Sequence, residues 1–214
     1  MGLSIERFTF NAFQENTIVV HDGSVCVIID PGCYDRSEQE TLVNYIEQNE
    51  LTVQAVLLTH AHIDHVLGCA FLLNKYKVDF YLHKEDLVTL HSVSNYAHVY
   101  GFPGYTPPPA PNKVLQGDEV LKFGEIEFEV FFTPGHAPGH VVYYNAETKS
   151  VINGDVLFAG SFGRVDLPGG DLETLKKSIF DILFKLPEDT VVYCGHGAET
   201  TIGQEKRSNY ILQY

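Results

Sequence analysis

Four side chains that can bind metals lie within six residues of one another in the segment LLTHAHIDHVLG, residues 57–68: His60, His62, Asp64 and His65. Imidazole and carboxylate groups are the natural protein ligands of zinc, iron and manganese. Residues two apart on an extended backbone point to the same side, so His60 and His62 can bind one ion together. The chain then enters a predicted helix, where Asp64 and His65 project in other directions. The segment therefore predicts two partial coordination spheres.

Three later segments can complete these spheres, because each ends an apolar run on a polar side chain. His136 follows a Pro-Gly turn in TPGHAPGH, Asp155 ends a run in NGD, and His196 ends another in CGHG. Functional groups collect where strands end and loops begin. Taken alone, Asp155 is an ordinary turn residue and His196 an ordinary loop histidine. Taken with the first cluster, they give seven ligands for two metal ions.

The elements that must position these ligands follow from apolar and β-branched patterning. Asp35 can cap the first helix, and residues 84–112 begin helically but become rich in proline and glycine after residue 100. Strands come in runs with helices between them, which favours two packed sheets flanked by helices over a doubly wound parallel sheet. We predict strands at 4–10, 16–22, 24–30, 53–58, 78–83, 125–133, 140–146, 150–155 and 190–195, and helices at 35–48, 64–77, 84–100 and 171–186.

Composition limits the class of protein and its partners. The 214 residues are predicted to form one domain, 1–214, without a secretory signal or a segment of roughly 20 apolar residues for a membrane span. The four cysteines form no C-x-x-C pair, which is typical of reduced thiols in the cytoplasm. The formal net charge of −14 disfavours nucleic-acid binding. We expect a small-molecule substrate, and the sequence leaves the oligomeric state open.

The motifs THAHIDH, TPGHAPGH, NGD and CGHG, which span nearly the whole chain, resemble the successive signatures of the metallo-β-lactamase superfamily. Within it, the phrases FGRVDLPGGD and GHGAETTIGQE resemble the short, single-domain members of the hydroxyacylglutathione hydrolase (glyoxalase II) branch. The resemblance implies an α/β (α+β) fold: an αββα four-layer sandwich of two mixed β-sheets flanked by helices. That agrees with the two-sheet arrangement expected from the patterning.

The resemblance also assigns the ligands, which spacing alone cannot do. It implies two divalent metal ions, with zinc favoured and iron or manganese as alternatives. Asp64 and Asp155 are implied as the catalytic carboxylates beside a metal-bound hydroxide. The implied sites are His60, His62 and His136 for one ion and Asp64, His65 and His196 for the other, with Asp155 as the bridge between them.

The implied activity is hydrolysis of S-acylglutathione thioesters, such as lactoylglutathione. The chain is expected to depart from the two-domain enzymes of this branch by lacking their C-terminal helical domain. It has Arg164 where they place a lysine and Ala198 where they place a tyrosine. Arg164 can bind a carboxylate bidentately, and Tyr100 and Tyr105 are further candidates for contact with the substrate. The alternative is that Arg164 forms a salt bridge with Asp166 and that the tyrosines only pack their segment onto the core.

Other functions remain open at the level of the sequence. A mononuclear iron persulfide dioxygenase needs two histidines and one carboxylate, which His60, His136 and Asp155 can supply. A lactonase or another esterase would direct the same nucleophile at a different acyl carbon. A binding scaffold with a decayed site is disfavoured, because all seven ligand positions carry competent residues.

Overall fold

The β-branched and aromatic runs of the N-terminal half form a six-stranded sheet in the computed structural model, which describes residues 2–214. Its strands follow one another in the order β1-β2-β3-β4-β5-β6. The pairs β1–β2 and β2–β3 are antiparallel, and the later pairs are parallel. The strands are β1 (Ser4–Phe10), β2 (Glu15–His21), β3 (Val25–Ile29), β4 (Thr52–Leu57), β5 (Asp79–His83) and β6 (Lys113–Leu115).

The second half of the chain forms a six-stranded sheet in the order β14-β13-β10-β9-β8-β7. Its pairs are antiparallel except β10–β13, which is parallel. A small hairpin lies between β10 and α5. The strands are β7 (Val120–Phe123), β8 (Ile126–Phe132), β9 (Val141–Asn145), β10 (Ser150–Gly154), β13 (Val191–Cys194) and β14 (Thr200–Thr201), with β11 (Leu157–Phe158) and β12 (Ser161–Phe162) in the hairpin.

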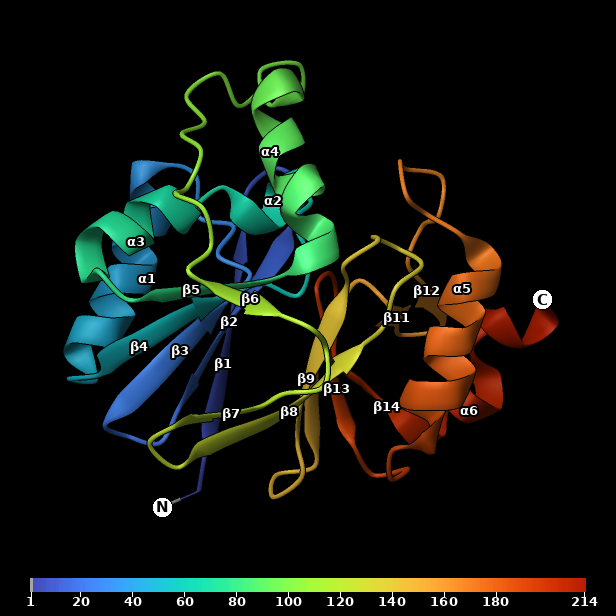
Figure 1. Cartoon of the computed structure of the whole chain (residues 1–214). Helices are drawn as coiled ribbons and strands as arrows, with labels where there is room; N and C mark the ends of the chain where they lie inside the picture. Colours follow the sequence, from blue (N-terminus) through green and yellow to red (C-terminus); the bar gives the residue numbers. More distant parts are fainter. Residues whose placement is uncertain (1) are drawn as a thin grey trace.

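Helices cover the outer face of each sheet, as Figure 1 shows, so the layers run helix, sheet, sheet, helix. The outer face of the first sheet carries α1 (Arg36–Gln48) and α3 (Cys69–Tyr76), whereas α2 (Ile63–Val66) and α4 (Leu87–Tyr96) lie at its upper edge in Figure 1. The second carries α5 (Leu172–Lys177) and α6 (Ile202–Ser208). Asp35 caps α1 and forms a capping box with Glu38, as its sequence position predicts. The two mixed sheets flanked by helices confirm the predicted αββα sandwich.

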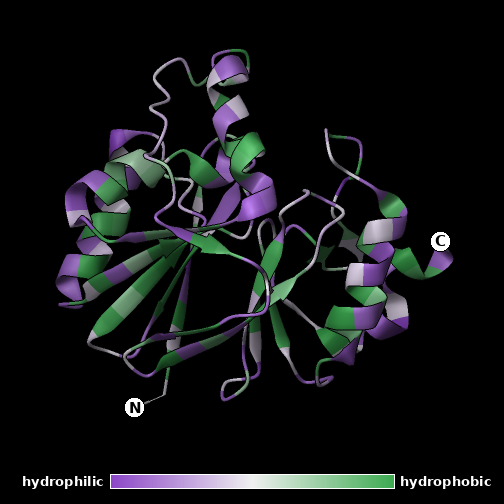
Figure 2. Ribbon diagram, viewed as in Figure 1, coloured by the Kyte–Doolittle hydropathy of each residue, from purple (hydrophilic) through white to green (hydrophobic). Residues whose placement is uncertain are grey.

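Three apolar layers hold this sandwich together, and Figure 2 shows apolar residues concentrated on the strands. One layer packs the first sheet against α1 and α3, one lies between the sheets, and one packs the second sheet against α5 and α6. In the middle layer the buried Tyr143 of β9 donates its hydroxyl to the carbonyl of Leu58, at 2.7 Å. That bond joins the second sheet to the end of β4, where the histidine cluster begins.

Two predicted helices differ from the single regular α-helix expected at each place. The helix expected over residues 64–77 is two short helices, α2 and α3, and at their junction the N–H of Gly68 donates to the carbonyl of Pro31 at 2.8 Å, outside the helix. The helix expected over 171–186 continues beyond α5 as a π-helical turn (Ser178–Ile182) and a 3-10 turn (Leu183–Lys185).

Segments with weak patterning account for most of the remaining differences. The expected helix 84–100 consists of a 3-10 turn (Lys84–Asp86) and α4, and its last residues form turns. Residues 101–112, all of which the structure describes, contain no helix or strand, as their proline- and glycine-rich composition predicts. The short strands β6, β7 and β14, the helix α6 and a final 3-10 turn (Tyr210–Gln213) were not predicted. Within residues 2–214, none of the helices is both long and apolar enough to cross a bilayer.

Candidate metal centre

The histidine cluster lies where β4 ends and α2 begins, at the edge where both sheets expose their loops. His62 is the N-cap of α2 and has an extended backbone, so His60 and His62 still point to the same side, as residues two apart on a strand do. Asp64 and His65 are already in the first turn of the helix and turn away from them. The change from extended backbone to helix therefore directs the two halves of the cluster to different places, as the spacing predicted.

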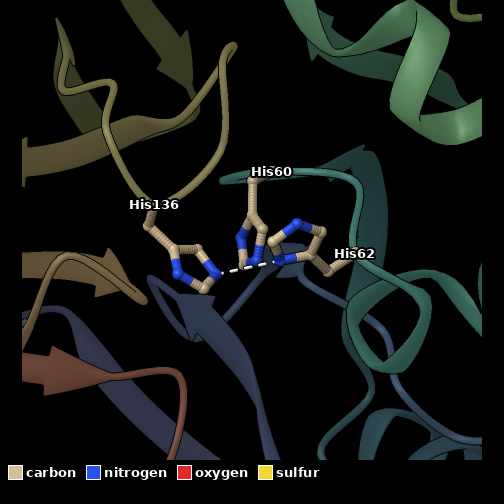
Figure 3. Close-up of side chains that lie close together, drawn as sticks. All are labelled: His60, His62 and His136. Atoms are coloured by element: carbon tan, nitrogen blue, oxygen red, sulfur yellow. Dashed lines mark hydrogen bonds between the residues drawn. The ribbon is translucent and has the colours of Figure 1, made fainter. Parts of the chain in front are cut away.

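His60 and His62 meet His136, which the loop after β8 contributes; Figure 3 shows the three rings side by side. We call these three residues the three-histidine group. His62 Nδ1 and His136 Nε2 are 2.9 Å apart. The ring of His60 lies 4.7 Å from that of His62 and 4.9 Å from that of His136. One nitrogen from each residue lies within 4.8 Å of the others, so all three can contact one cation.

Asp64, His65 and His196 form a second set of converging ligand atoms, which we call the Asp64 group. His196 Nε2 lies 3.1 Å from Asp64 Oδ2, and His65 Nε2 lies 3.5 Å from the same oxygen. His196 arrives from the end of β13, more than 120 residues later in the chain. The structure therefore brings a distant histidine to the first helical turn of the cluster.

Asp155 lies between the two groups. Its Oδ2 is 3.5 Å from His136 Nε2 and 3.5 Å from His196 Nε2. Its Oδ1 is 3.6 Å from His65 Nε2. One carboxylate thus contacts a member of the three-histidine group and two members of the Asp64 group. All seven residues predicted from the sequence converge at one place.

The electrostatics of the centre favour ionised carboxylates. Burial alone would raise the pKa of Asp155, but the nearby charge of His65 and the contact with His196 outweigh burial and hold that pKa well below its usual value. Burial lowers the pKa of His196, yet its bonds to Asp155 and Asp64 outweigh burial and raise the pKa to about 9. In the three-histidine group, burial and repulsion between the imidazoles lower the pKa of His62 to about 3. A neutral imidazole is the form that binds a metal.

Several polar atoms of the centre are buried without a protein partner. Across the described residues, His60 Nε2, His65 Nε2 and Asp155 Oδ1 have no hydrogen-bond partner. A buried polar atom left unpaired costs about 1–3 kcal/mol, so such atoms are rare unless a function requires them. Here they point into a space surrounded by imidazole nitrogens and carboxylate oxygens, the donor set of zinc, iron and manganese sites. The residues present therefore fit bound divalent metal ions.

The ring nitrogens that face away from the centre are held by backbone and hydroxyl groups. His60 Nδ1 lies 3.0 Å from Thr59 Oγ1, and His136 Nδ1 lies 2.8 Å from the carbonyl oxygen of Arg164. His196 Nδ1 lies 3.2 Å from the carbonyl oxygen of Phe13. Such outer contacts fix which nitrogen points inward and how each ring is oriented.

Sequence reasoning missed two buried carboxylates behind the Asp64 group. Asp30 accepts hydrogen bonds from the backbone N–H and hydroxyl of Thr59, and its Oδ2 lies 3.1 Å from His65 Nδ1. Glu15 lies 4.0 Å from the same nitrogen. The signal for Asp30 was its place at the end of the apolar run VCVIID before Pro-Gly, the same pattern that marked Asp155.

His140 supports the centre from behind. Its Nε2 accepts the backbone N–H of Asp155 at 3.1 Å, and its ring stacks on that of His60 with centroids 4.7 Å apart. The glycines of the motifs NGD and CGHG are required by close approach. A Cβ on Gly154 would lie 2.8 Å from His140 Nε2, and one on Gly195 would collide with the Asp155 carboxylate.

The predicted substrate residues lie in different settings. Arg164 pairs bidentately with Asp166, with both N–O distances 2.7 Å, and this pair is exposed. Tyr100 is 52% exposed. Tyr105 packs against the core beneath the 84–112 segment, and its hydroxyl is buried without a partner in the described chain. Sequence reasoning also missed Phe13, which is 39% exposed and packs at a tilt against Tyr100, with ring centroids 6.0 Å apart.

Comparisons with known proteins agree with this geometry. A family model described as "Metallo-beta-lactamase superfamily" matches residues 10–196. The chain is 38% identical over 212 residues to hydroxyacylglutathione hydrolase GloC of Haemophilus influenzae, covering 98% of each. It superimposes with a TM-score of 0.86 on TTHA1623 in a di-iron-bound form (40% identity, 96% of this chain and 98% of that one). It superimposes equally, at 0.86, on the BLEG-1 B3 metallo-beta-lactamase (34% identity, 99% and 100%).

Proposed function

Because the chain belongs to the metallo-beta-lactamase superfamily and is a metal-dependent hydrolase, we propose that it is a thioesterase acting on S-acylglutathione-type thioesters, such as lactoylglutathione. The observation that carries the proposal is the convergence of two complete ligand groups with Asp155 between them. The full-length similarity to a hydroxyacylglutathione hydrolase supports the substrate class. It is the similarity in sequence, rather than the metal ligands, that favours a thioester over other activated acyl groups.

We propose that the three-histidine group holds one divalent ion, that the Asp64 group holds a second, and that Asp155 contacts both. Zinc is our proposed metal because its preferred ligands match these groups, and iron is the alternative because TTHA1623 was solved in a di-iron-bound form. Two divalent ions held by these residues would lower the pKa of a bound water and would polarise the acyl carbonyl.

Asp64 and Asp155 are the residues we propose for handling the proton of the attacking water. Burial opposes their ionisation, but the neighbouring His65 outweighs it and keeps the pKa of both carboxyls low. An ionised carboxylate can accept a proton and can orient a water molecule by accepting its hydrogen bond. The leaving group is a thiolate, which is stable near neutral pH, so the cleavage does not require a general acid.

The exposed groups next to the centre suit the two ends of such a substrate. Arg164 can exchange Asp166 for a glutathione carboxylate at little cost, because an exposed ion pair contributes only about 0–1 kcal/mol. Phe13 and Tyr100 offer an apolar wall, and the carbonyl of Phe13 contacts His196, which places this wall at the edge of the Asp64 group. The buried Phe102, whose ring centroid lies 5.8 Å from that of Phe13, supports the wall from the core side.

The setting proposed for the enzyme is the cytoplasm, as a single domain spanning 1–214 that binds neither nucleic acid nor membrane. All four cysteines, Cys26, Cys33, Cys69 and Cys194, are buried free thiols. Burial raises the pKa of Cys26 and of Cys194 to about 12. Thiols of that kind are unreactive packing groups and suit a reducing compartment.

A persulfide dioxygenase is the main alternative chemistry. Its three ligands, His60, His136 and Asp155, do lie together. A mononuclear iron enzyme, however, gives no reason for His65 and His196 to lie against the Asp64 carboxylate as well as against Asp155. The complete Asp64 group therefore favours a dinuclear hydrolase.

The experiment is a substrate panel assayed on protein of measured metal content. S-Lactoylglutathione, a small uncharged aryl ester, a lactone and a chromogenic β-lactam would be compared by kcat/KM, and glutathione persulfide by oxygen uptake. We expect the highest kcat/KM for the glutathione thioester. We also expect His62→Ala to lose metal and turnover, whereas His91→Ala, an exposed histidine on α4, keeps both. Oxygen uptake without thioester hydrolysis, or a preference for the lactone or the β-lactam, would contradict the proposal.

A further inference from the structure

A buried carboxylate outside the seven proposed ligands connects two of the loops that carry them. Asp86 ends the 3-10 turn before α4 and is 0% exposed. Its Oδ2 accepts the backbone N–H of Ala61 at 2.7 Å. Its Oδ1 accepts the backbone N–H of Gly139 at 3.0 Å and the hydroxyl of Thr89 at 3.2 Å. All three donors point at one carboxylate that water does not reach.

The two backbone donors belong to the loops of the three-histidine group. Ala61 lies between His60 and His62, and Gly139 lies in the loop that carries His136. The approach at Gly139 is close: a Cβ there would collide with the backbone nitrogen of Asp86 and lie 2.7 Å from its Cβ. Asp86 therefore fixes the distance between the segment after β4 and the loop after β8, which must both be in place before three imidazoles can converge.

The Asp64 group is held by different residues. His65 is backed by Asp30 and Glu15, and His196 by the carbonyl of Phe13. None of the hydrogen bonds of the Asp86 carboxylate in the described structure reaches Asp64, His65 or His196. Asp30 also reaches His60 through the hydroxyl of Thr59, whereas the contacts of the Asp86 carboxylate serve the loops of the three-histidine group alone.

We propose that Asp86 is a positioning residue that sets the metal affinity of the three-histidine group independently of the Asp64 group. The inference rests on the proposed metal centre but does not depend on which acyl substrate is cleaved. An Asp86→Asn substitution keeps the size of the side chain and replaces one acceptor oxygen by an N–H donor. In either orientation of the amide, that donor faces the N–H of Ala61 or of Gly139, so one of the two loops loses its hydrogen bond.

Loss of such an outer contact typically weakens metal binding by about 10–100-fold. To assign the loss to one group, zinc affinity is measured by competition with a chromophoric chelator in two backgrounds. His196→Ala disables the Asp64 group and reports the three-histidine group, whereas His62→Ala reports the Asp64 group. We expect Asp86→Asn to weaken binding by about 10–100-fold in the first background and to leave it unchanged in the second.

Asp22→Asn is the matched control, because Asp22 also joins two loops by accepting backbone N–H groups. It bonds Ser24 and Val25 on one side and Glu125 on the other, at distances of 2.8–3.0 Å. It lies before β3, whereas Asp30 and the metal centre lie after that strand. We expect Asp22→Asn to leave zinc affinity unchanged in both backgrounds, although it too removes a carboxylate that joins two loops.

Thr89→Val is the milder variant if Asp86→Asn does not fold, since it removes only the hydroxyl donor to Asp86 and should weaken the three-histidine group by a smaller factor. Unchanged affinity in the His196→Ala background, or an equal loss in both backgrounds, would overturn the inference. If the unsubstituted protein bound no divalent ions, the proposed function itself would fail. Normal binding of two ions together with an unaffected Asp86→Asn variant would refute only the role of Asp86.

Discussion

Replacing Asp30 by asparagine should reverse the tautomer of a proposed metal ligand. A carboxylate only accepts hydrogen bonds, so Asp30 Oδ2, at 3.1 Å, favours a proton on Nδ1 of His65. In the neutral ring, which is the form that binds a metal, the other nitrogen, Nε2, keeps its lone pair and faces Asp64 and Asp155. In Asp30→Asn the amide oxygen, placed as Oδ1 is, keeps the N–H of Thr59. The amide N–H₂, placed as Oδ2 is, faces His65 and the hydroxyl of Thr59, which donates to Oδ2 in the unsubstituted protein. The proton of His65 should move to Nε2 and block the ligand atom.

The size of the effect follows from these contacts. An outer-contact substitution of this kind costs about 10–100-fold in metal affinity, which corresponds to about 1.4–2.8 kcal/mol of binding free energy. If the amide takes the other orientation, the N–H of Thr59 loses its acceptor instead. A buried donor left unpaired costs about 1–3 kcal/mol of the free energy of unfolding. Either orientation therefore leaves a measurable defect, in affinity or in stability.

The assay measures both quantities on one set of proteins. Zinc affinity of the Asp64 group is measured by chelator competition in the His62→Ala background, and the free energy of unfolding by urea. Asp22→Asn is again the control, because it removes the same charge at the opposite end of β3. Unchanged zinc affinity together with unchanged stability in Asp30→Asn would refute the role given to Asp30 and the inward orientation of His65 Nε2.

Three further predictions concern the substrate site and pH. Arg164→Ala should raise KM for glutathione thioesters about tenfold or more, through loss of a charge-assisted hydrogen bond, and should leave KM for small uncharged esters unchanged. The control Asp166→Ala should leave KM unchanged for both kinds of substrate. Equal effects of Arg164→Ala on the two kinds of substrate would exclude Arg164 from the substrate site. Phe13→Ala should raise KM for aromatic acyl groups by about 2–10-fold, and no change would exclude the aromatic wall. Since the pKa of His196 is about 9 without metal, against 6.5 as its ordinary value, metal binding at pH 7.5 should release a proton from it. Calorimetry in two buffers of different ionisation enthalpy counts that proton.

The sign of that pKa shift also sets the stability of the metal-free protein. A histidine whose pKa is raised on folding stabilises the chain fully below its unfolded pKa of 6.5 and loses that contribution as the pH rises through about 9. The free energy of unfolding by urea, measured without metal between pH 6 and 10, should therefore fall across this window. A larger fall in a His196→Ala variant would contradict the shift.

The sequence was sufficient for the sandwich and for the convergence of seven ligand-type residues. Long β-branched runs locate strands, and a polar residue at the end of each run marks the edge where Asp155 and His196 are found. Short elements such as β6 and α6 escaped, because three to seven residues carry little periodicity. The interruption at Gly68 also escaped, since the N–H of Gly68 donates to the carbonyl of Pro31, which is distant in the sequence.

Outer contacts of the centre could not be predicted for a related reason. Asp86 looks like an ordinary helix-start residue in KEDLVTL, and its importance comes from two N–H groups supplied by loops 25 and 53 residues away. Phe13 follows an unremarkable turn, and only the approach of His196 and Tyr100 places it at the centre. Pairings of this kind arise from the packing of the two sheets, which no local pattern encodes.

Anomalous diffraction from crystals grown with zinc is the most direct test of a dinuclear centre. Data collected on both sides of the zinc absorption edge would locate each bound ion independently of any model of the site. We expect two peaks, one contacted by His60, His62 and His136 and the other by Asp64, His65 and His196, with Asp155 touching both. A single peak at full zinc loading, or peaks away from these residues, would contradict the proposed centre.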